Sequence, residues 1–131
     1  MAGLGDSMVA GVLRADDIAR ANKFYVDTLG LAKGPSSPNG DMFMAGDGTA
    51  VMVYERPGMP APQNTTLGFA VAADKFDSVV EDLRAKGVVF EEYDIPEMGL
   101  KTVNGVVTSD DGSKAAWFKD SEGNVLNIAV M

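Results

Sequence analysis

The stretch "VLRADDIARANKFYVDTLGL", residues 12–31, joins a short apolar run to an amphipathic helical pattern. Asp16 or Asp17 stands where a helix N-cap is expected, and Gly30 stands where the helix should end. The apolar face of this helix is formed by Ile18, Ala21 and Tyr25. The stretch therefore predicts a buried strand, which begins near residue 8, followed by a helix.

The same pattern returns in "TTLGFAVAADKFDSVVEDLRAKG", residues 65–87. The separation of Asp17 from Asp74 along the chain equals the separation of Gly30 from Gly87. Asp74 is predicted to cap the second helix. Its apolar face is formed by Phe76, Val79, Val80 and Leu83. The chain thus contains two strand–helix units of matching length.

The segments that follow each helix also correspond. Asp47-Gly48 leads into "TAVMVY", and Glu122-Gly123 leads into "NVLNIA", at a larger offset that leaves room for a longer excursion in the second half. We therefore expect an α+β fold of two β-α-β-β-β repeats, whose curved mixed sheets surround a cavity. The predicted organisation is one domain over 1–131, with repeat 1 at about 8–55, a proline-rich linker at 56–64 and repeat 2 at about 65–131.

Composition narrows the possible chemistry. The net charge of −8 offers no basic cluster for nucleic acid, and no apolar run approaches the length of a membrane helix. We expect a cytoplasmic protein that binds neither nucleic acid nor membrane. The chain has no Cys and no His, which excludes disulfides, thiolate nucleophiles and imidazole-bound metals. Any metal would need oxygen ligands, as Mg²⁺, Ca²⁺ or Mn²⁺ do.

Two segments resemble the vicinal oxygen chelate superfamily. The stretch 12–31 resembles its first strand and helix, and "AAWFKDSEGNVLNI", residues 115–128, resembles its closing hairpin. This superfamily includes glyoxalase I, extradiol dioxygenases, methylmalonyl-CoA epimerase, fosfomycin-modifying enzymes and metal-free bleomycin resistance proteins. The resemblance implies curved sheets around a cavity, and it implies a homodimer.

Catalytic members of that superfamily hold a divalent metal with His and Glu side chains from the first and last strands of each repeat. The resemblance places those positions near Ala10, at Met52 (or at Tyr54 with a slip of two residues), at Thr66 and at Asn127 in this chain. Ala and Met do not ligate a hard cation, and Thr and Asn are neutral, weak ligands. The only nearby carboxylate, Glu55, lies on the opposite face of its strand by alternation. We expect no metal cofactor; the alternative is a divalent metal with oxygen ligands.

Strand alternation and the resemblance together predict a mostly apolar cavity with a few polar groups. Its expected ligand-binding residues are Ala10, Val12, Arg14, Met52, Tyr54, Thr66, Gly68, Tyr93, Trp117 and Asn127. Trp117 is either a stacking platform or core packing, and Arg14 either pairs with an anionic ligand or forms a salt bridge. The long excursion at 91–105 is either a pocket rim or a solvated acidic edge.

Three functions follow from these features. The leading hypothesis is a glyoxalase/bleomycin-resistance-like protein that binds a small apolar or aromatic molecule without a metal. The alternative is a lyase, isomerase or dioxygenase of the same superfamily, with an oxygen-ligated divalent metal for which Glu55 is the nearest carboxylate. The third is a protein-interaction module with an unused cavity. The sequence does not identify a catalytic residue.

Overall fold

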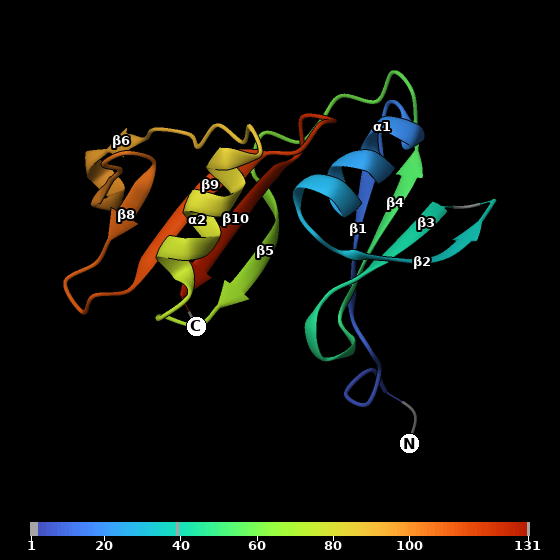
Figure 1. Cartoon of the computed structure of the whole chain (residues 1–131), viewed down its shortest axis with the longest axis horizontal. Coiled ribbons are helices and arrows are strands. Elements are labelled where there is room, and N and C mark those ends of the chain that lie inside the picture. Colours follow the sequence, from blue (N-terminus) through green and yellow to red (C-terminus); the bar gives the residue numbers. More distant parts are fainter. Residues whose placement is uncertain (1–2, 39, 131) are drawn as a thin grey trace. The chain divides into compact units, whose positions relative to one another are not determined.

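The computed structural model describes residues 3–38 and 40–130, and the chain divides into two compact units, residues 1–60 and 61–131. The division falls inside the proline-rich segment 56–64. Each unit contains a four-stranded mixed sheet with a helix against one face (Figure 1). The predicted α+β class is therefore confirmed. The expected homodimer stays a prediction.

The first unit follows the order strand, helix, strand, strand, strand. Its elements are β1 (Ala10–Ala15), α1 (Ile18–Lys23), a π-helical turn (Phe24–Thr28), β2 (Ala32–Ser37), β3 (Gly40–Met44), a short 3₁₀ turn (Gly46–Gly48) and β4 (Ala50–Glu55). The sheet order is β1-β4-β3-β2, and β1 runs parallel to β4. Parallel pairing of the first and last strands requires the helical crossover between them.

Side chains cap the N-terminus of α1, and a glycine ends the helical segment that α1 and the π-helical turn form together. Asp17 is the N-cap, and its side chain accepts from the backbone N–H of Arg20 at 3.1 Å. The Glu55 carboxylate accepts from the N–H of Ile18 at 2.9 Å, so a second free donor of the first turn has a partner. Gly30 ends the helical segment with a φ of +78°. These contacts confirm the predicted helix and choose Asp17 over Asp16 as its cap.

The apolar face of α1 covers one side of the first sheet. Ala21 of α1 and Tyr25 of the π-helical turn that follows it are fully buried there. The Tyr25 ring stacks on Phe43 of β3, with 5.4 Å between the ring centroids. Leu13 and Val53 are register partners and are also buried, so the helix covers the face of β1 and β4 that carries them. The opposite sheet face is left without a helix.

The second unit repeats this plan with an insertion. Its elements are β5 (Thr65–Val71), α2 (Phe76–Ala85), β6 (Asp94–Ile95), a 3₁₀ turn (Pro96–Met98), β7 (Leu100–Lys101), β8 (Val106–Thr108), β9 (Lys114–Lys119) and β10 (Val125–Val130). The sheet order β5-β10-β9-β8 corresponds position by position to that of the first unit. The small β6–β7 hairpin belongs to the excursion between α2 and β8.

The predicted cap of α2 is wrong, although the helix is present. The N-cap residue is Lys75, which makes no side-chain capping hydrogen bond. A backbone turn, in which the N–H of Lys75 donates to the carbonyl of Ala72 at 3.0 Å, carries the chain past Asp74 before the helix begins. Phe76, Val80 and Leu83 are buried as predicted, because their spacing places them on one side of the helix.

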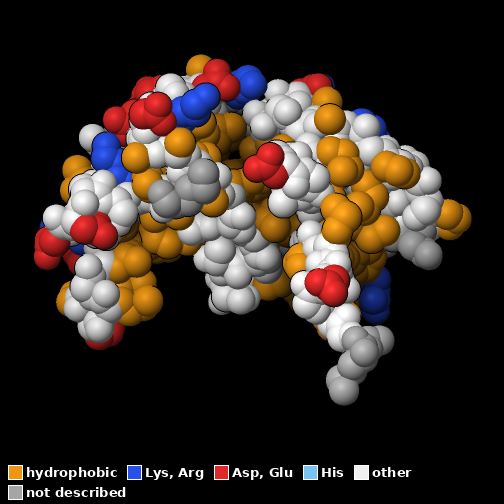
Figure 2. Space-filling view, turned by 90° about the horizontal axis from the view of Figure 1, so that it is seen from below, with side chains coloured by type: hydrophobic (Ala, Val, Ile, Leu, Met, Phe, Trp, Pro, Cys, Tyr) orange, Lys and Arg blue, Asp and Glu red, His pale blue; other side chains and the backbone are white. Residues whose placement is uncertain are grey.

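No helix within the described ranges is long and apolar enough to cross a membrane. Hydrophobic side chains nevertheless show on the surface of each unit (Figure 2). Val12 of β1 is 61% exposed, and Val89, which follows α2, is 79% exposed.

Candidate ligand-binding site

The closing hairpin is held by the side chain of Asp120. Its Oδ1 accepts from the backbone N–H groups of Glu122 and Asn124, each at 2.8 Å. Its Oδ2 accepts from the Asn124 side-chain amide at 2.9 Å. All three residues are buried. This turn places Lys119 at the end of β9 directly opposite Val125 at the start of β10.

The pairing of β5, β10 and β9 divides their residues between two faces. Phe118, Leu126 and Ile128 are buried on the face that α2 covers. On the open face, Asn127 lies between its register partners Gly68 and Trp117. A Cβ added to Gly68 would lie 2.5 Å from Oδ1 of Asn127, so the asparagine side chain extends over the glycine. The predicted grouping of Gly68, Trp117 and Asn127 is present in the structure.

The start of β5 departs from strict alternation. Val125 pairs with Thr65, whereas Leu126 pairs with Leu67, so one extra residue is accommodated between them. Thr65 Oγ1 accepts from the indole Nε1 of Trp117 at 3.1 Å. The predicted ligand-binding residue Thr66 donates its hydroxyl to the backbone carbonyl of Val125 at 3.0 Å. The irregular pairing therefore gives Thr65 the contact with Trp117.

The segment after α2 is tied to the sheet. The backbone N–H of Glu91 donates to the carbonyl of Trp117 at 2.8 Å. Thr102 holds Tyr93 from two directions: its Oγ1 accepts from the Tyr93 N–H at 2.8 Å, and its own N–H donates to the Tyr93 carbonyl at 2.9 Å. The N–H of Gly105 donates to the Glu92 carboxylate at 2.5 Å. These bonds fix the backbone of the excursion and attach its start to β9.

Tyr93 and Trp117 form an aromatic pair beside the open sheet face. Their ring centroids are 5.7 Å apart with an interplanar angle of 77°, an edge-to-face arrangement. Trp117 is held at its indole nitrogen by Thr65, and Tyr93 is held at its backbone by Thr102. The indole is thus anchored through its nitrogen, and the backbone that carries the Tyr93 ring is anchored by Thr102.

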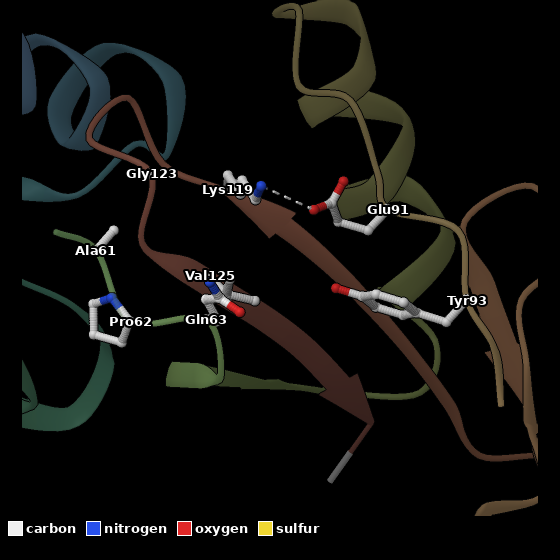
Figure 3. Close-up of a pocket in the computed structure, with 8 residues that line it drawn as sticks. All are labelled: Ala61, Pro62, Gln63, Glu91, Tyr93, Lys119, Gly123 and Val125. Atoms are coloured by element: carbon white, nitrogen blue, oxygen red, sulfur yellow. Dashed lines mark ion pairs between the residues drawn. The ribbon is translucent and has the colours of Figure 1, made fainter.

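A pocket of about 400 Å³ lies next to this pair. It is lined by Ala61, Pro62, Gln63, Glu91, Tyr93, Lys119, Gly123 and Val125 (Figure 3). All of these residues belong to the second unit. In Figure 3 the Tyr93 ring extends from the excursion toward Val125 and Gln63. Four of the lining side chains carry polar groups, and two of these, Glu91 and Lys119, are charged.

The charged groups of the pocket lie side by side. Lys119 Nζ is 3.8 Å from Oε1 of Glu91, an ion pair drawn as a dashed line in Figure 3. Burial, and then the negative charge of Glu91, raise the pKa of Tyr93 above its ordinary value of 10.0. The phenol is protonated near neutral pH already at its ordinary pKa, and this shift extends the protonated range to higher pH. It acts in the pocket as a hydrogen-bond donor and acceptor, not as a base.

The remaining predicted residues lie on the open face of the first sheet. Val12 pairs in register with Met52, and Arg14 pairs with Tyr54. Ala10 lies two residues before Val12 on the same strand. Alternation therefore gives these residues one common face, as predicted, on a unit separate from the pocket.

Arg14 is buried and forms a salt bridge to Asp16, with 2.9 Å between Nη2 and Oδ2. This supports the salt-bridge interpretation of Arg14. A ligand anion would have to compete with the Asp16 carboxylate for the same guanidinium group.

The positions at which the resemblance led us to expect metal ligands do not make up a ligand set. Ala10 and Met52 offer no hard donor atom, and the Thr66 hydroxyl is bonded to a backbone carbonyl. The Glu55 carboxylate accepts a hydrogen bond at the N-terminus of α1. Among residues 3–38 and 40–130, no three acidic side chains converge in a way that would hold a metal ion. These residues do not fit the metal that the family implies.

Among the predicted site residues, all of which the structure describes, Tyr93 alone lines this pocket; the other lining residues were missed. For Lys119 and Val125 a signal was available, because Lys119 is two residues after Trp117 and Val125 is two residues before Asn127 on their strands. Glu91 belonged to the predicted rim but was not assigned to the site. Gln63 and its neighbours lie in the predicted linker, where no periodicity indicates which side chains face a pocket.

The two units define an α+β protein of the glyoxalase fold, with open curved sheets that each carry a helix on one face. The chain belongs to the glyoxalase/bleomycin resistance protein/dioxygenase superfamily, whose model matches residues 7–128. No match was found among curated proteins.

Solved structures with the same fold agree with this family. A superfamily member from Sphaerobacter thermophilus is 20% identical, with a TM-score of 0.73, and the match covers 98% of this chain and 100% of that chain. A lactoylglutathione lyase from Agrobacterium tumefaciens is 18% identical, with a TM-score of 0.70 and coverages of 98% and 96%. The fosfomycin resistance protein FosX from Listeria monocytogenes is 14% identical, with a TM-score of 0.67 and coverages of 96% and 91%.

Proposed function

We propose that the chain binds a small aromatic molecule in the pocket of the second unit, without a metal ion. The observation that carries this proposal is the Tyr93 ring, which lines a pocket of about 400 Å³ and packs edge-to-face on Trp117. A flat ligand gains from edge or face contact with the Tyr93 ring, and the polar groups around it orient the ligand. The contact with Trp117, which Thr65 anchors, limits the ordering of side chains that binding requires.

The metal-free part of the proposal rests on the chemistry of the donor set. Ala10 and Met52 stand at positions where the resemblance places metal ligands. The Glu55 carboxylate already accepts a hydrogen bond from the N–H of Ile18 at the N-terminus of α1. The solved structures with this fold include a lyase and a fosfomycin resistance protein, so the fold accommodates both enzymes and resistance proteins. The alternative function remains a lyase, isomerase or dioxygenase with an oxygen-ligated divalent metal.

We also propose that the protein is a cytoplasmic homodimer. Light scattering of the purified protein measures its mass and tests the dimer.

Ligand binding is measured with a panel of aromatic metabolites and antibiotics. Trp117 is the only tryptophan in the chain, so its fluorescence reports directly on the site. A ligand present at 100 times its dissociation constant adds about 2.7 kcal/mol of stability, which a thermal shift assay detects. Tyr93→Ala should weaken binding, whereas Tyr54→Ala, on the sheet of the first unit, should leave it unchanged. A panel without any hit would refute the proposal and favour an interaction module.

Elemental analysis of protein purified without chelator tests the metal. We expect no stoichiometric divalent ion, and we expect Glu55→Ala to change stability alone. A bound divalent metal that is lost on Glu55→Ala, together with an activity, would establish the alternative enzyme function.

A further inference from the structure

The pocket contains one cation and one anion at short range, and this arrangement bears on the charge of its ligand. Lys119 Nζ and Glu91 Oε1 are 3.8 Å apart, beyond the roughly 2.7–2.9 Å of a charge-assisted hydrogen bond. The side chains are 58% and 31% exposed, respectively. Each group therefore keeps hydrogen-bonding capacity for a ligand while it partly neutralises the other.

The two groups come from separate elements that hold them in place. Lys119 is the last residue of β9, opposite Val125. Glu91 is bonded through its backbone N–H to the carbonyl of Trp117, two residues before Lys119 on the same strand. A ligand that lies against Val125 and Tyr93 thus meets an ammonium donor and a carboxylate acceptor next to each other.

A ligand with a single charged group meets repulsion from one of the two. A carboxylate beside Lys119 is repelled by Glu91, and an amidinium beside Glu91 is repelled by Lys119, because the two charges are too close to be approached separately. A neutral amide avoids both repulsions. Its carbonyl oxygen accepts from Lys119 while its N–H group donates to Glu91, and it gives up less hydration than an ion does.

We propose that this pocket selects an uncharged aromatic ligand that carries a hydrogen-bond acceptor and a donor side by side, as aromatic primary amides and lactams do. This inference rests on the proposed function and specifies its ligand class. The neutral phenol of Tyr93 and the amide of Gln63 favour the same chemistry, since each of them can donate and accept.

Three probes with one ring system separate the effect of charge from that of shape: 2-naphthamide, 2-naphthoate and 2-naphthamidine. Titration calorimetry on the full chain measures the dissociation constant of each. We expect 2-naphthamide to bind about three- to tenfold more tightly than either ion, as a net unpaired charge next to an exposed ion pair implies. Tighter binding of 2-naphthoate or 2-naphthamidine than of the amide, or equal binding of all three, would overturn the inference.

Removing one charge at a time should reverse the preference. Lys119→Met leaves Glu91 alone, and we expect 2-naphthamidine to become the tightest probe. Glu91→Gln leaves Lys119 alone, and we expect 2-naphthoate to become the tightest. Lys114→Met is the matched control for the first variant, because Lys114 lies on the same strand and pairs with Asp77 at 3.0 Å outside the pocket.

Glu97→Gln, an exposed position in the excursion that does not line this pocket, is the matched control for Glu91→Gln. Both control variants make the same change in net charge as their partners and should keep the wild-type order of affinities. A control that shifts the order as far as its partner does would show a general charge effect and overturn the assignment to this pocket.

The experiment also distinguishes this inference from the function on which it rests. If none of the three probes binds while another aromatic compound binds and loses affinity on Tyr93→Ala, the ligand class is wrong and the proposed function stands. If neither the probes nor the panel of aromatic compounds binds, both are overturned. Circular dichroism of each variant verifies that it is folded before its titration is interpreted.

Discussion

Replacement of Asp120 by alanine should destabilise the second unit strongly, because one carboxylate closes the turn between β9 and β10. Three hydrogen bonds end on it: two from the backbone N–H groups of Glu122 and Asn124, and one from the Asn124 side chain. Asp120 is 7% exposed and Asn124 is 1% exposed, so water has little access to the donors that the substitution would leave behind.

The magnitude follows from the number and kind of these bonds. A hydrogen bond to a charged group contributes about 1.5–3 kcal/mol, and a buried donor left without a partner costs about 1–3 kcal/mol. The three bonds share one acceptor group and do not add independently. We therefore expect Asp120→Ala to lower the free energy of unfolding by about 3–5 kcal/mol, a large part of the roughly 5–15 kcal/mol that holds a typical domain together.

Urea unfolding followed by the fluorescence of Trp117 measures this loss on the affected unit, since Trp117 lies on β9. Asp111→Ala is the control. Asp111 also closes a turn with its side chain, accepting from the N–H and the hydroxyl of Ser113 at 3.0 and 2.7 Å, but it does so at the surface. A loss below about 1 kcal/mol for Asp120→Ala, or equal losses for both variants, would refute the argument from burial.

Three further outcomes are expected. Gly105→Ala should cost about 1–3 kcal/mol in urea unfolding, because the glycine has a φ of +77° and a new Cβ would lie 2.6 Å from Cβ of Phe90. Asn22→Ala should raise the pKa of Asp41, measured by NMR titration, because the hydrogen bond from Asn22 is the main cause of its lowered pKa. That stabilisation is present above the ordinary value of 3.8 and is lost as the pH falls through the lower folded value, so the stability difference between wild type and variant should shrink in acid. The pKa of Tyr93 is raised in the folded state, so its contribution to the free energy of unfolding is fully present below the ordinary value of 10.0. That contribution is lost as the pH rises through the folded pKa, and Tyr93→Phe should remove this loss of stability at alkaline pH.

Each of these outcomes has a counterpart that isolates its cause. Gly112→Ala has a similar φ of +89° with no atom within 4 Å of the added Cβ, so equal costs at the two glycines would contradict the clash with Phe90. An Asp41 pKa that stays low in Asn22→Ala would assign the shift to Ser36 and Lys33 instead. The difference in tyrosinate absorbance between wild type and Tyr93→Phe gives the titration of Tyr93 itself; a difference that titrates at or below the ordinary value of 10.0 would contradict the raised pKa.

Much of the fold could be predicted from local patterns. The helical spacing around Ala21 and Tyr25, with Asp17 before it and Gly30 after it, corresponds to α1, because capping and amphipathicity act over a few residues. The start of α2 shows the limit of such patterns. Asp74 is a good capping residue by type, yet the backbone turn from Ala72 moves the helix start to Phe76.

Sequence predicted the candidate site only where alternation along a single strand determines which face a side chain lies on. Alternation along β10 puts Asn127 on the open face, and the structure agrees. The irregular pairing that gives Thr65 the contact with Trp117 depends on how β5 meets β10, and a single strand carries no sign of it. The sequence also could not relate Glu91 to Lys119, because the two residues lie far apart along the chain.

The sequence by itself determined the family, the repeated order of the main strands and helices without the β6–β7 hairpin, and the absence of every Cys and His ligand, because these depend on residue types and short-range periodicity. The tertiary structure alone decided that Gln63, Tyr93, Glu91 and Lys119 border one pocket. Their meeting requires three distant segments to be brought together by the pairing of β5 and β9 with β10 and by the bond from the Glu91 N–H to the Trp117 carbonyl. Long-range pairing of this kind is set by the packing of the whole unit, so the polar character of the pocket follows from the fold and not from any one stretch of sequence.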